Sequence, residues 1–216
     1  MRVEHINHDS TKLLIFFCGF YTDANCFAEF DNCKSDILFV WDYSELNYDI
    51  FEDFDFTPYV EINLIAYSYG VWAAAQAIKQ YLPPLNQSAA ISGTMTPVDD
   101  NLGVPSKIFD IMLNALSWDT LEKFEKKMLE GVPEAPKKAE RTLENLRDEL
   151  ENVKRNKDLN GCDVSLYDKV ILTTKDRIFP YRSQAAFWQE HRNKTELECG
   201  HFPFYRFKDF DEILIS

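Results

Sequence analysis

The sequence predicts an α/β domain in which a mostly parallel, doubly wound sheet is covered by helices on both faces. Predominantly apolar runs of five or six residues recur along the chain, and helical patterns lie between several of them. Runs without apolar-polar alternation are typical of strands buried on both faces, as in parallel sheets. One long segment without such a run, 96–161, predicts a helical insertion into this alternation.

Six strands are expected, each bounded by polar, glycine or proline residues. Their ranges are 12–17, 36–41, 62–66, 88–93, 169–174 and 195–198. Two helices are expected among them: the alanine-rich segment 71–81, which ends before Pro83, and the segment 181–192, which follows Pro180. With 216 residues, the chain is long enough for one domain with an insertion.

The segment 96–161 is expected to form a helical cap over an α/β core made of residues 1–95 and 162–216. It contains no apolar strand pattern and three helical segments. The residues expected to begin or cap these helices are, in order, Pro105, Asp119 with Glu122, and Pro136. The apolar stripe expected on the third helix consists of Leu143, Leu146, Leu150 and Val153. Such an amphipathic helix is expected to cover another part of the protein.

The overall composition excludes several classes of partner. The net charge of −13 argues against nucleic acid, because phosphate binding needs concentrated lysine and arginine. No apolar run approaches the ~20 residues that a membrane helix needs. The first eight residues also lack the apolar core of a secretory signal. These features predict a cytoplasmic protein without a membrane partner.

The charge is distributed unevenly along the chain. Residues 21–61 include eleven acidic residues and one basic residue, whereas residues 137–157 include seven basic and five acidic residues. An acidic partner is therefore expected to approach the later segment.

The cysteines predict reduced thiols. They are Cys18, Cys26, Cys33, Cys162 and Cys199, an odd number without a C-x-x-C pair. This pattern argues against a disulfide framework or a zinc ribbon. No cysteine lies at a strand-to-helix turn beside a recognisable base, so a cysteine nucleophile is not favoured. Since the sequence shows no cluster of metal ligands, neither a metal nor an organic cofactor is expected.

A candidate nucleophile, Ser68, lies where the strand at 62–66 gives way to the helix at 71–81. An apolar run that ends in a serine and continues directly into a helix is typical of a nucleophile elbow. The strained turn needs small residues two positions to either side of the serine, and Ala66 and Gly70 meet that need. Glycine is more usual than alanine at the first position. The alternative interpretation is a buried strand and helix with an incidental serine.

A serine at such a turn needs a histidine base, which an acid orients. His201 lies in a loop after the last expected strand, and Asp176 closely follows the strand at 169–174. The chain order Ser68, Asp176, His201 is that of the α/β-hydrolases, so the sequence predicts this fold and a Ser-His-Asp triad.

Other residues offer weaker alternatives for the acid and the base. Asp99 and Asp100 could replace Asp176, because some members of this fold take the acid from an earlier strand. Their loop is more simply explained as the start of the cap. The remaining histidines, all expected at the surface, are His5, His8 and His191.

An oxyanion hole in this fold uses the N–H of the residue after the nucleophile and a second N–H from the loop after an early strand. Tyr69 supplies the first. The sequence Cys18-Gly19-Phe20 follows the strand at 12–17, so the N–H of Phe20 is the expected second donor. The alternative is an ordinary glycine turn. Together with the triad, these donors predict hydrolysis of an ester or thioester through an acyl-serine.

Beyond these motifs, most of the chain resembles the BioG family, the pimeloyl-acyl-carrier-protein methyl ester esterases of biotin synthesis. The segments that carry the resemblance are 17–20, 41–49, 66–72, 101–105, 108–109, 175–179, 187–188 and 200–201. Alanine at position 66 is what this family shows, whereas Cys18 stands where the family often has alanine or histidine. The resemblance implies the triad and the oxyanion donors named above.

The resemblance also implies a substrate and a partner: the methyl ester of a seven-carbon diacyl chain on acyl carrier protein, hydrolysed to pimeloyl-acyl-carrier protein and methanol. Carrier proteins are acidic, which fits the basic part of the cap. Candidate contacts are Lys137, Lys138, Arg141, Arg147, Lys154 and Arg155. For each of them, a solvated helix face is the alternative. The alternative functions are an acyl-carrier-protein or acyl-CoA thioesterase of the same fold and a non-catalytic hydrolase-fold binding protein.

Overall fold

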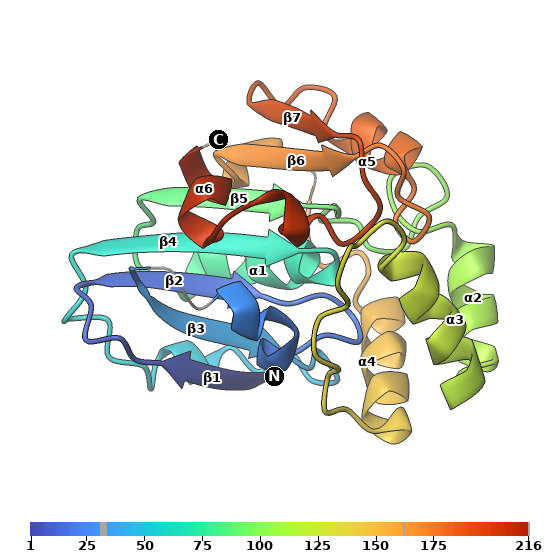
Figure 1. Ribbon diagram of the computed structural model, residues 1–216, viewed down its shortest axis with the longest axis horizontal. Coiled ribbons are helices and arrows are strands. Elements are labelled where there is room, and N and C mark those ends of the chain that lie inside the picture. The colour runs from blue at the N-terminus through green and yellow to red at the C-terminus, as the bar shows by residue number, and fades with distance from the viewer. Residues whose placement is uncertain (31–33, 162, 216) are drawn as a thin grey trace.

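The computed structural model describes residues 1–30, 34–161 and 163–215. Their central feature is a seven-stranded sheet in the order β1-β3-β2-β4-β5-β6-β7 (Figure 1). The strands are β1 (Arg2–Ile6), β2 (Lys12–Phe17), β3 (Asp36–Trp41), β4 (Glu61–Tyr67), β5 (Gln87–Ile91), β6 (Lys169–Thr173) and β7 (Lys194–Leu197). Only β1 runs antiparallel to its neighbour. The mostly parallel sheet expected from the apolar runs is confirmed.

Side chains on the two faces of the sheet belong to two separate apolar cores. In β2, Ile15 and Phe17 face one core, and Leu14 and Phe16 face the other. Helix α1 (Tyr69–Gln80) covers the first face and α6 (Phe210–Ile215) covers the second (Figure 1). Both faces of the central strands are therefore buried, which explains why their sequences show no alternation.

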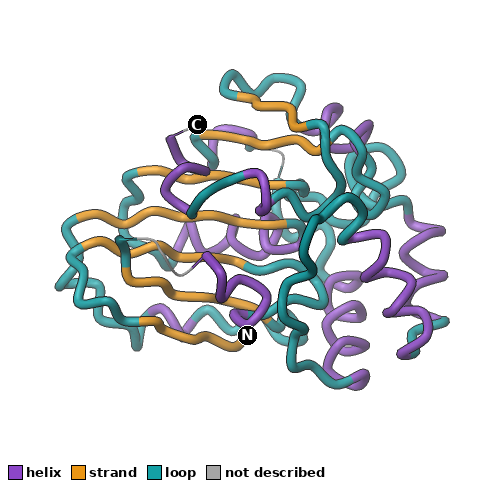
Figure 2. The backbone as a smooth tube through the Cα atoms, viewed as in Figure 1, coloured by secondary structure: helices purple, strands orange, loops and turns teal. Residues whose placement is uncertain are grey.

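The three helices between β5 and β6 lie together beyond the carboxyl ends of the parallel strands (Figures 1 and 2). They are α2 (Ser106–Asn114), α3 (Trp118–Met128) and α4 (Leu143–Arg155). On α4, the expected apolar stripe faces inward: Leu146, Leu150 and Val153 are fully buried. The division of the chain into a core (1–95 and 162–216) and a cap (96–161) stays a prediction.

Two helix starts differ from the expected ones. The N-cap of α3 is Ser117, which forms a capping box with Thr120, in place of the expected pair of Asp119 and Glu122. The third helix begins at Leu143 rather than near Pro136, because the Thr142 side chain accepts the N–H of Asn145 and caps the helix there.

Two further expectations were wrong. Helix α5 (Tyr181–Phe187) ends five residues before the expected Arg192, in a tight turn. This turn buries His191, whose Nε2 lies 2.7 Å from the main-chain oxygen of Tyr167, so the residue is not at the surface. Strand β1 was not expected, since its side chains are mostly exposed and its sequence lacks an apolar run.

Short 3₁₀ helices complete the described chain: Ala24–Phe30, Asp49–Phe51, Val164–Leu166 and Phe204–Arg206. No helix within the described ranges is long and apolar enough to cross a membrane. The cysteines Cys18, Cys26 and Cys199 are buried free thiols. Cys33 and Cys162 lie outside the described residues.

Candidate active site

Ser68 occupies the sharp turn between β4 and α1. Its backbone has φ 55° and ψ −120°, a conformation that residues with a side chain seldom adopt. The turn lies at the carboxyl end of a central parallel strand, where open α/β sheets bind their ligands. The Ser68 side chain is thereby presented at the edge of the sheet that faces α2 and α3.

Three small residues make room for this turn. A Cβ atom added at Gly70 would lie 2.3 Å from the main-chain oxygen of Phe17, so only glycine fits. Ala66 is fully buried between β2 and β5. The sequence did not point to Gly93, yet a Cβ atom there would lie 2.3 Å from the main-chain oxygen of Ser68. This close approach comes from the neighbouring strand and leaves no local signal in the sequence.

The structure brings Ser68, His201 and Asp176 into one hydrogen-bonded chain. Nε2 of His201 lies 3.0 Å from Oγ of Ser68, and Nδ1 of His201 lies 2.7 Å from Oδ2 of Asp176. All three residues are buried. This geometry suits proton transfer from the serine hydroxyl to a histidine that a carboxylate holds in place.

The carboxylate of Asp176 is itself held by several donors. Its Oδ1 accepts the N–H groups of Ile178 and Phe179, both at 2.8 Å. Its Oδ2 accepts from Oγ1 of Thr173 at 3.0 Å and from Nε2 of Gln184 at 2.9 Å. Sequence reasoning missed Thr173 and Gln184, because a strand residue and a helix residue meet here only through the fold.

The alternative acids and bases lie outside this chain of hydrogen bonds. Oδ1 of Asp99 accepts N–H groups of its own loop, and Oδ1 of Asp100 accepts the N–H of Ser106 at the start of α2. His5 and His8 are exposed, as expected.

Phe20 and Tyr69, whose N–H groups are the expected oxyanion donors, line the same cavity as Ser68. Tyr69 is the first residue of α1, and the N–H groups of a helix's first turn have no acceptor within the helix. Phe20 lies in the loop after β2, and its ring is 6.4 Å from the ring of Tyr69. Neither N–H donates a hydrogen bond to another residue within the described ranges. Their role as oxyanion donors stays a prediction.

A cavity of about 300 Å³ opens above Ser68, between the sheet edge and helices α2 and α3. Its lining is predominantly apolar, with three cationic side chains. The apolar side chains that line it come mainly from Phe20, Val104, Ile108, Phe109, Ile111, Met112, Phe124, Ile178 and Phe179. The cationic residues are Lys123, Lys127 and Arg177. Sequence reasoning looked for cations only after residue 136 and therefore missed the two lysines of α3.

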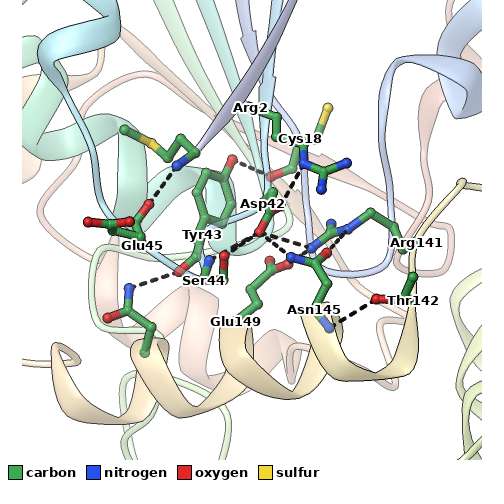
Figure 3. Close-up of polar contacts among 12 residues, drawn as sticks. Arg2, Cys18, Asp42, Tyr43, Ser44, Glu45, Arg141, Thr142, Asn145 and Glu149 are labelled. Carbon is green, nitrogen blue, oxygen red and sulfur yellow. Dashed lines mark hydrogen bonds and ion pairs between the residues drawn. The ribbon is translucent and has the colours of Figure 1, made fainter.

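One expected carrier contact, Arg141, was wrong. Its side chain is 0% exposed and forms an ion pair with Glu149, which is also 0% exposed. Its Nη2 lies 3.5 Å from Oδ1 of Asp42, at the end of β3, and Figure 3 shows the guanidinium between these two carboxylates. A residue enclosed between α4 and the sheet cannot contact a protein partner.

The other expected carrier contacts differ in their exposure and in the groups with which they already interact. Lys138 pairs with Glu125 at 3.4 Å, and Lys154 pairs with Asp110 at 2.7 Å. Arg147 is half-buried and donates to the main-chain oxygen of Leu113, in the last turn of α2, and to that of Leu116, beyond the end of α2. Lys137 and Arg155 are exposed. Their contact with a carrier protein stays a prediction.

Within the described part of the chain, no group of three or more histidine, cysteine, aspartate or glutamate side chains could hold a metal ion.

Comparison with known proteins gives relatives over nearly the whole chain. The family model described as pimeloyl-ACP methyl esterase BioG matches residues 1–213. A protein of Bacteroides fragilis named malonyl-[acyl-carrier protein] O-methyltransferase is 33% identical over 88% of this chain. The matched region covers only 39% of that relative's length. An uncharacterized protein of Haemophilus influenzae is 26% identical over 96% of both chains.

Solved structures agree with this result. The crystal structure of BioG from Haemophilus influenzae superposes with a TM-score of 0.83 at 25% identity, covering 98% of both chains. A hydrolase from Pseudomonas aeruginosa superposes with a TM-score of 0.66 at 11% identity, covering 95% of this chain and 88% of that one, which shows the fold. The predicted α/β-hydrolase fold is confirmed, and the chain belongs to the BioG family.

Proposed function

We propose that this protein is a serine carboxylesterase that hydrolyses the methyl ester of pimeloyl-acyl-carrier protein to pimeloyl-acyl-carrier protein and methanol in biotin synthesis. The observation that carries the proposal is the hydrogen-bonded chain of Ser68, His201 and Asp176 at the base of an apolar cavity, in a member of the BioG family. Ser68 is the nucleophile, His201 the general base and acid, and Asp176 the group that orients His201.

The proposed reaction has two steps. Nε2 of His201 takes the proton of the Ser68 hydroxyl as Oγ attacks the ester carbonyl carbon. The N–H groups of Phe20 and Tyr69 stabilise the oxyanion, a contribution of about 2.7–4 kcal/mol per donor. Protonated His201 then gives its proton to the departing methoxide, which leaves as methanol. In the second step, His201 activates a water molecule that releases the carboxylate and restores Ser68.

The cavity supports an acyl substrate with an acidic carrier. Its apolar lining favours the methylene chain, because burial of each CH₂ group is worth about 0.8 kcal/mol. Lys123 and Lys127 add positive charge to the same cavity, whereas Arg177 pairs with Glu130 at 3.1 Å. The name of the Bacteroides fragilis relative concerns an acyl group on acyl carrier protein, which supports a carrier-bound substrate here.

The two alternative functions differ from the proposal in their products. A thioesterase of the same fold would release the free thiol of the carrier or of coenzyme A, whereas the proposed esterase releases methanol and leaves the thioester intact. A non-catalytic binding protein would release neither product, and a fluorophosphonate probe would not label its Ser68.

Complementation tests the proposed function in a cell. A biotin auxotroph that lacks its pimeloyl ester esterase is expected to grow without biotin when it expresses the wild-type chain. The same strain is expected to need biotin when it expresses Ser68→Ala at an equal level. Growth with Ser68→Ala, or no growth with a wild-type protein that accumulates in the cell, would contradict the proposal.

Charge reversal of the two cavity lysines tests the carrier as the partner. Lys123→Glu with Lys127→Glu is expected to raise the KM for a carrier-bound ester by about tenfold, because attraction to the acidic carrier is lost. The KM for an uncharged p-nitrophenyl ester should stay the same. Both constants are measured at low and high salt, and screening should shrink the effect on the carrier-bound ester.

Lys79→Glu is the matched control, since Lys79 is exposed near the far end of α1. This variant is expected to leave both KM values unchanged. Equal increases for the carrier-bound and the small ester in the cavity variant would refute a role in carrier binding.

A further inference from the structure

Two buried hydroxyl groups hold the loop that carries the N–H of Phe20. Thr22 is 0% exposed, and its Oγ1 donates to the main-chain oxygen of Gly19 at 2.8 Å. The N–H of Thr22 donates to the same oxygen at the longer distance of 3.3 Å. The carbonyl of Gly19 and the N–H of Phe20 belong to one peptide group, which is planar and trans. Fixing the direction of this carbonyl therefore fixes the N–H of Phe20 in the opposite direction.

The second hydroxyl acts on the preceding peptide group. The hydroxyl of Tyr43 donates to the main-chain oxygen of Cys18 at 2.7 Å, and Figure 3 shows the ring of Tyr43 reaching this carbonyl. The N–H of Cys18 donates to the main-chain oxygen of Val40 at 2.8 Å. Each of the two peptide groups that meet at Gly19, the most flexible residue of the loop, thus accepts a hydrogen bond from a buried side-chain hydroxyl.

Tyr43 is in turn held by helix α4. Nδ2 of Asn152 donates to the main-chain oxygen of Tyr43 at 2.8 Å, and Nδ2 of Asn145 donates to Asp42 at 2.7 Å. Asp42 has φ 64°, a left-handed conformation that is costly for a residue with a side chain. A residue keeps a strained backbone conformation only where the surrounding contacts hold it there. Here the hydrogen bonds from α4 to Asp42 and Tyr43 hold Asp42 in this conformation and place Tyr43 next to the loop.

The loop also packs directly against the serine. A Cβ atom added at Gly19 would lie 3.0 Å from Cβ of Ser68 and 2.9 Å from Cε1 of Tyr67. A shift of the loop would therefore change the distance between Ser68 and the N–H of Phe20.

We infer that Thr22 and Tyr43 are positioning residues of the oxyanion hole, with Thr22 acting directly on the peptide group that donates. This inference rests on the proposed serine-esterase function and goes beyond it. A hydrogen bond accepted by a peptide carbonyl also polarises the N–H of the same group and strengthens it as a donor. Neither Thr22 nor Tyr43 lines the cavity, so we expect them to contribute little to binding of the ester in the ground state.

Thr22→Val removes the hydroxyl and keeps the branched shape, whereas Thr22→Ser keeps the hydroxyl. Thr22→Val is expected to lower kcat for a p-nitrophenyl ester by about tenfold, less than the 10²–10³-fold typical of losing a donor altogether. KM should stay unchanged, and Thr22→Ser should restore kcat. A trifluoromethyl ketone, whose adduct with Ser68 carries an oxyanion, should bind Thr22→Val about tenfold more weakly. Tyr43→Phe should change kcat and ketone binding in the same direction.

Ser88→Ala is the matched control. Ser88 is 3% exposed and lies at the amino end of β5, away from the carboxyl ends of the strands where Ser68 lies, and its hydroxyl donates to Oδ2 of Asp168 at 2.8 Å. It should lose a similar amount of thermal stability and keep its kcat and its affinity for the ketone.

The outcomes separate the inference from the proposed function. A wild-type enzyme that depends on Ser68, together with a Thr22→Val enzyme of unchanged kcat and ketone affinity, would overturn the positioning role alone. Loss of kcat in Thr22→Ser equal to that in Thr22→Val would also overturn it. A wild-type protein that neither hydrolyses esters nor binds the ketone would overturn the proposed function, and the positioning role with it.

Discussion

Ser68→Ala is expected to lower kcat for ester hydrolysis by about 10⁶-fold, the loss seen when a serine hydrolase loses its nucleophile. The substitution removes the only atom that can form the acyl-enzyme, and what activity remains must come from water and the oxyanion donors. The free energy of unfolding should change by less than about 1 kcal/mol, because the Ser68 hydroxyl makes one hydrogen bond among the described residues, to His201, and only that bond is lost.

The measurement combines steady-state hydrolysis of a p-nitrophenyl ester, labelling by a fluorophosphonate probe and thermal unfolding. Ser183→Ala is the control, since Ser183 is 0% exposed and its Oγ has no hydrogen-bond partner in the described part of the chain. It should keep both activity and labelling. Labelling of Ser68→Ala at the wild-type rate would place the nucleophile elsewhere.

Arg141→Met is expected to lower the free energy of unfolding by about 3–5 kcal/mol. The substitution leaves Glu149 buried without its ionic partner, in a site where the side chain is 0% exposed. Burial raises the pKa of the Glu149 carboxyl above its ordinary value even with the guanidinium of Arg141 beside it. Removing the guanidinium should raise this pKa further.

The loss should therefore grow with pH. A carboxyl whose pKa is higher in the folded than in the unfolded chain adds stability below its unfolded pKa of about 4.3, and this stability is lost as the pH rises through the folded pKa. Urea unfolding between pH 5 and pH 8 should show the difference between Arg141→Met and wild type widening as the pH increases. A difference that stays constant or narrows would contradict this account of the cluster.

Two controls sharpen the test of Arg141. Arg141→Met combined with Glu149→Leu removes both charges, and it should recover most of the lost stability and its dependence on pH. The cluster holds two buried polar atoms without partners among the described residues, Nη1 of Arg141 and Oε1 of Glu149, which favours this recovery. Lys154→Met breaks an exposed pair with Asp110 and should cost less than about 1 kcal/mol.

Much of the fold could be predicted because its central strands are buried on both faces. The runs at 12–17 and 36–41 coincide with β2 and β3, since apolar residues fill both sides of the strand. Strand β1 was not predicted, because it is an exposed edge strand. The start of α4 was not predicted correctly, because it depends on the cap that Thr142 provides rather than on the prolines before it.

The residues of the candidate site also fall into those that the sequence could predict and those that it could not. Ser68, Asp176 and His201 could be found because their chain order and their places at strand ends follow from the topology. Gln184 could not, because only the folded chain brings its side chain from α5 to Asp176. Thr22 could not, because its hydrogen bond to the carbonyl of Gly19 depends on the local turn and on the orientation of its side chain, which the sequence does not show. Arg141 was assigned wrongly because a charged residue in a basic segment is expected in solvent, and its buried partner, Glu149, was not recognised.

The most direct test of the central claim is the intact mass of acyl carrier protein bearing the pimeloyl methyl ester after incubation with the purified protein. With wild type, the carrier is expected to lose the mass of one methylene group while methanol appears, because the ester is cleaved and the thioester is kept. With Ser68→Ala, the mass should not change. Release of the free carrier thiol, or an unchanged mass with wild type, would contradict the assignment of this protein as a methyl esterase.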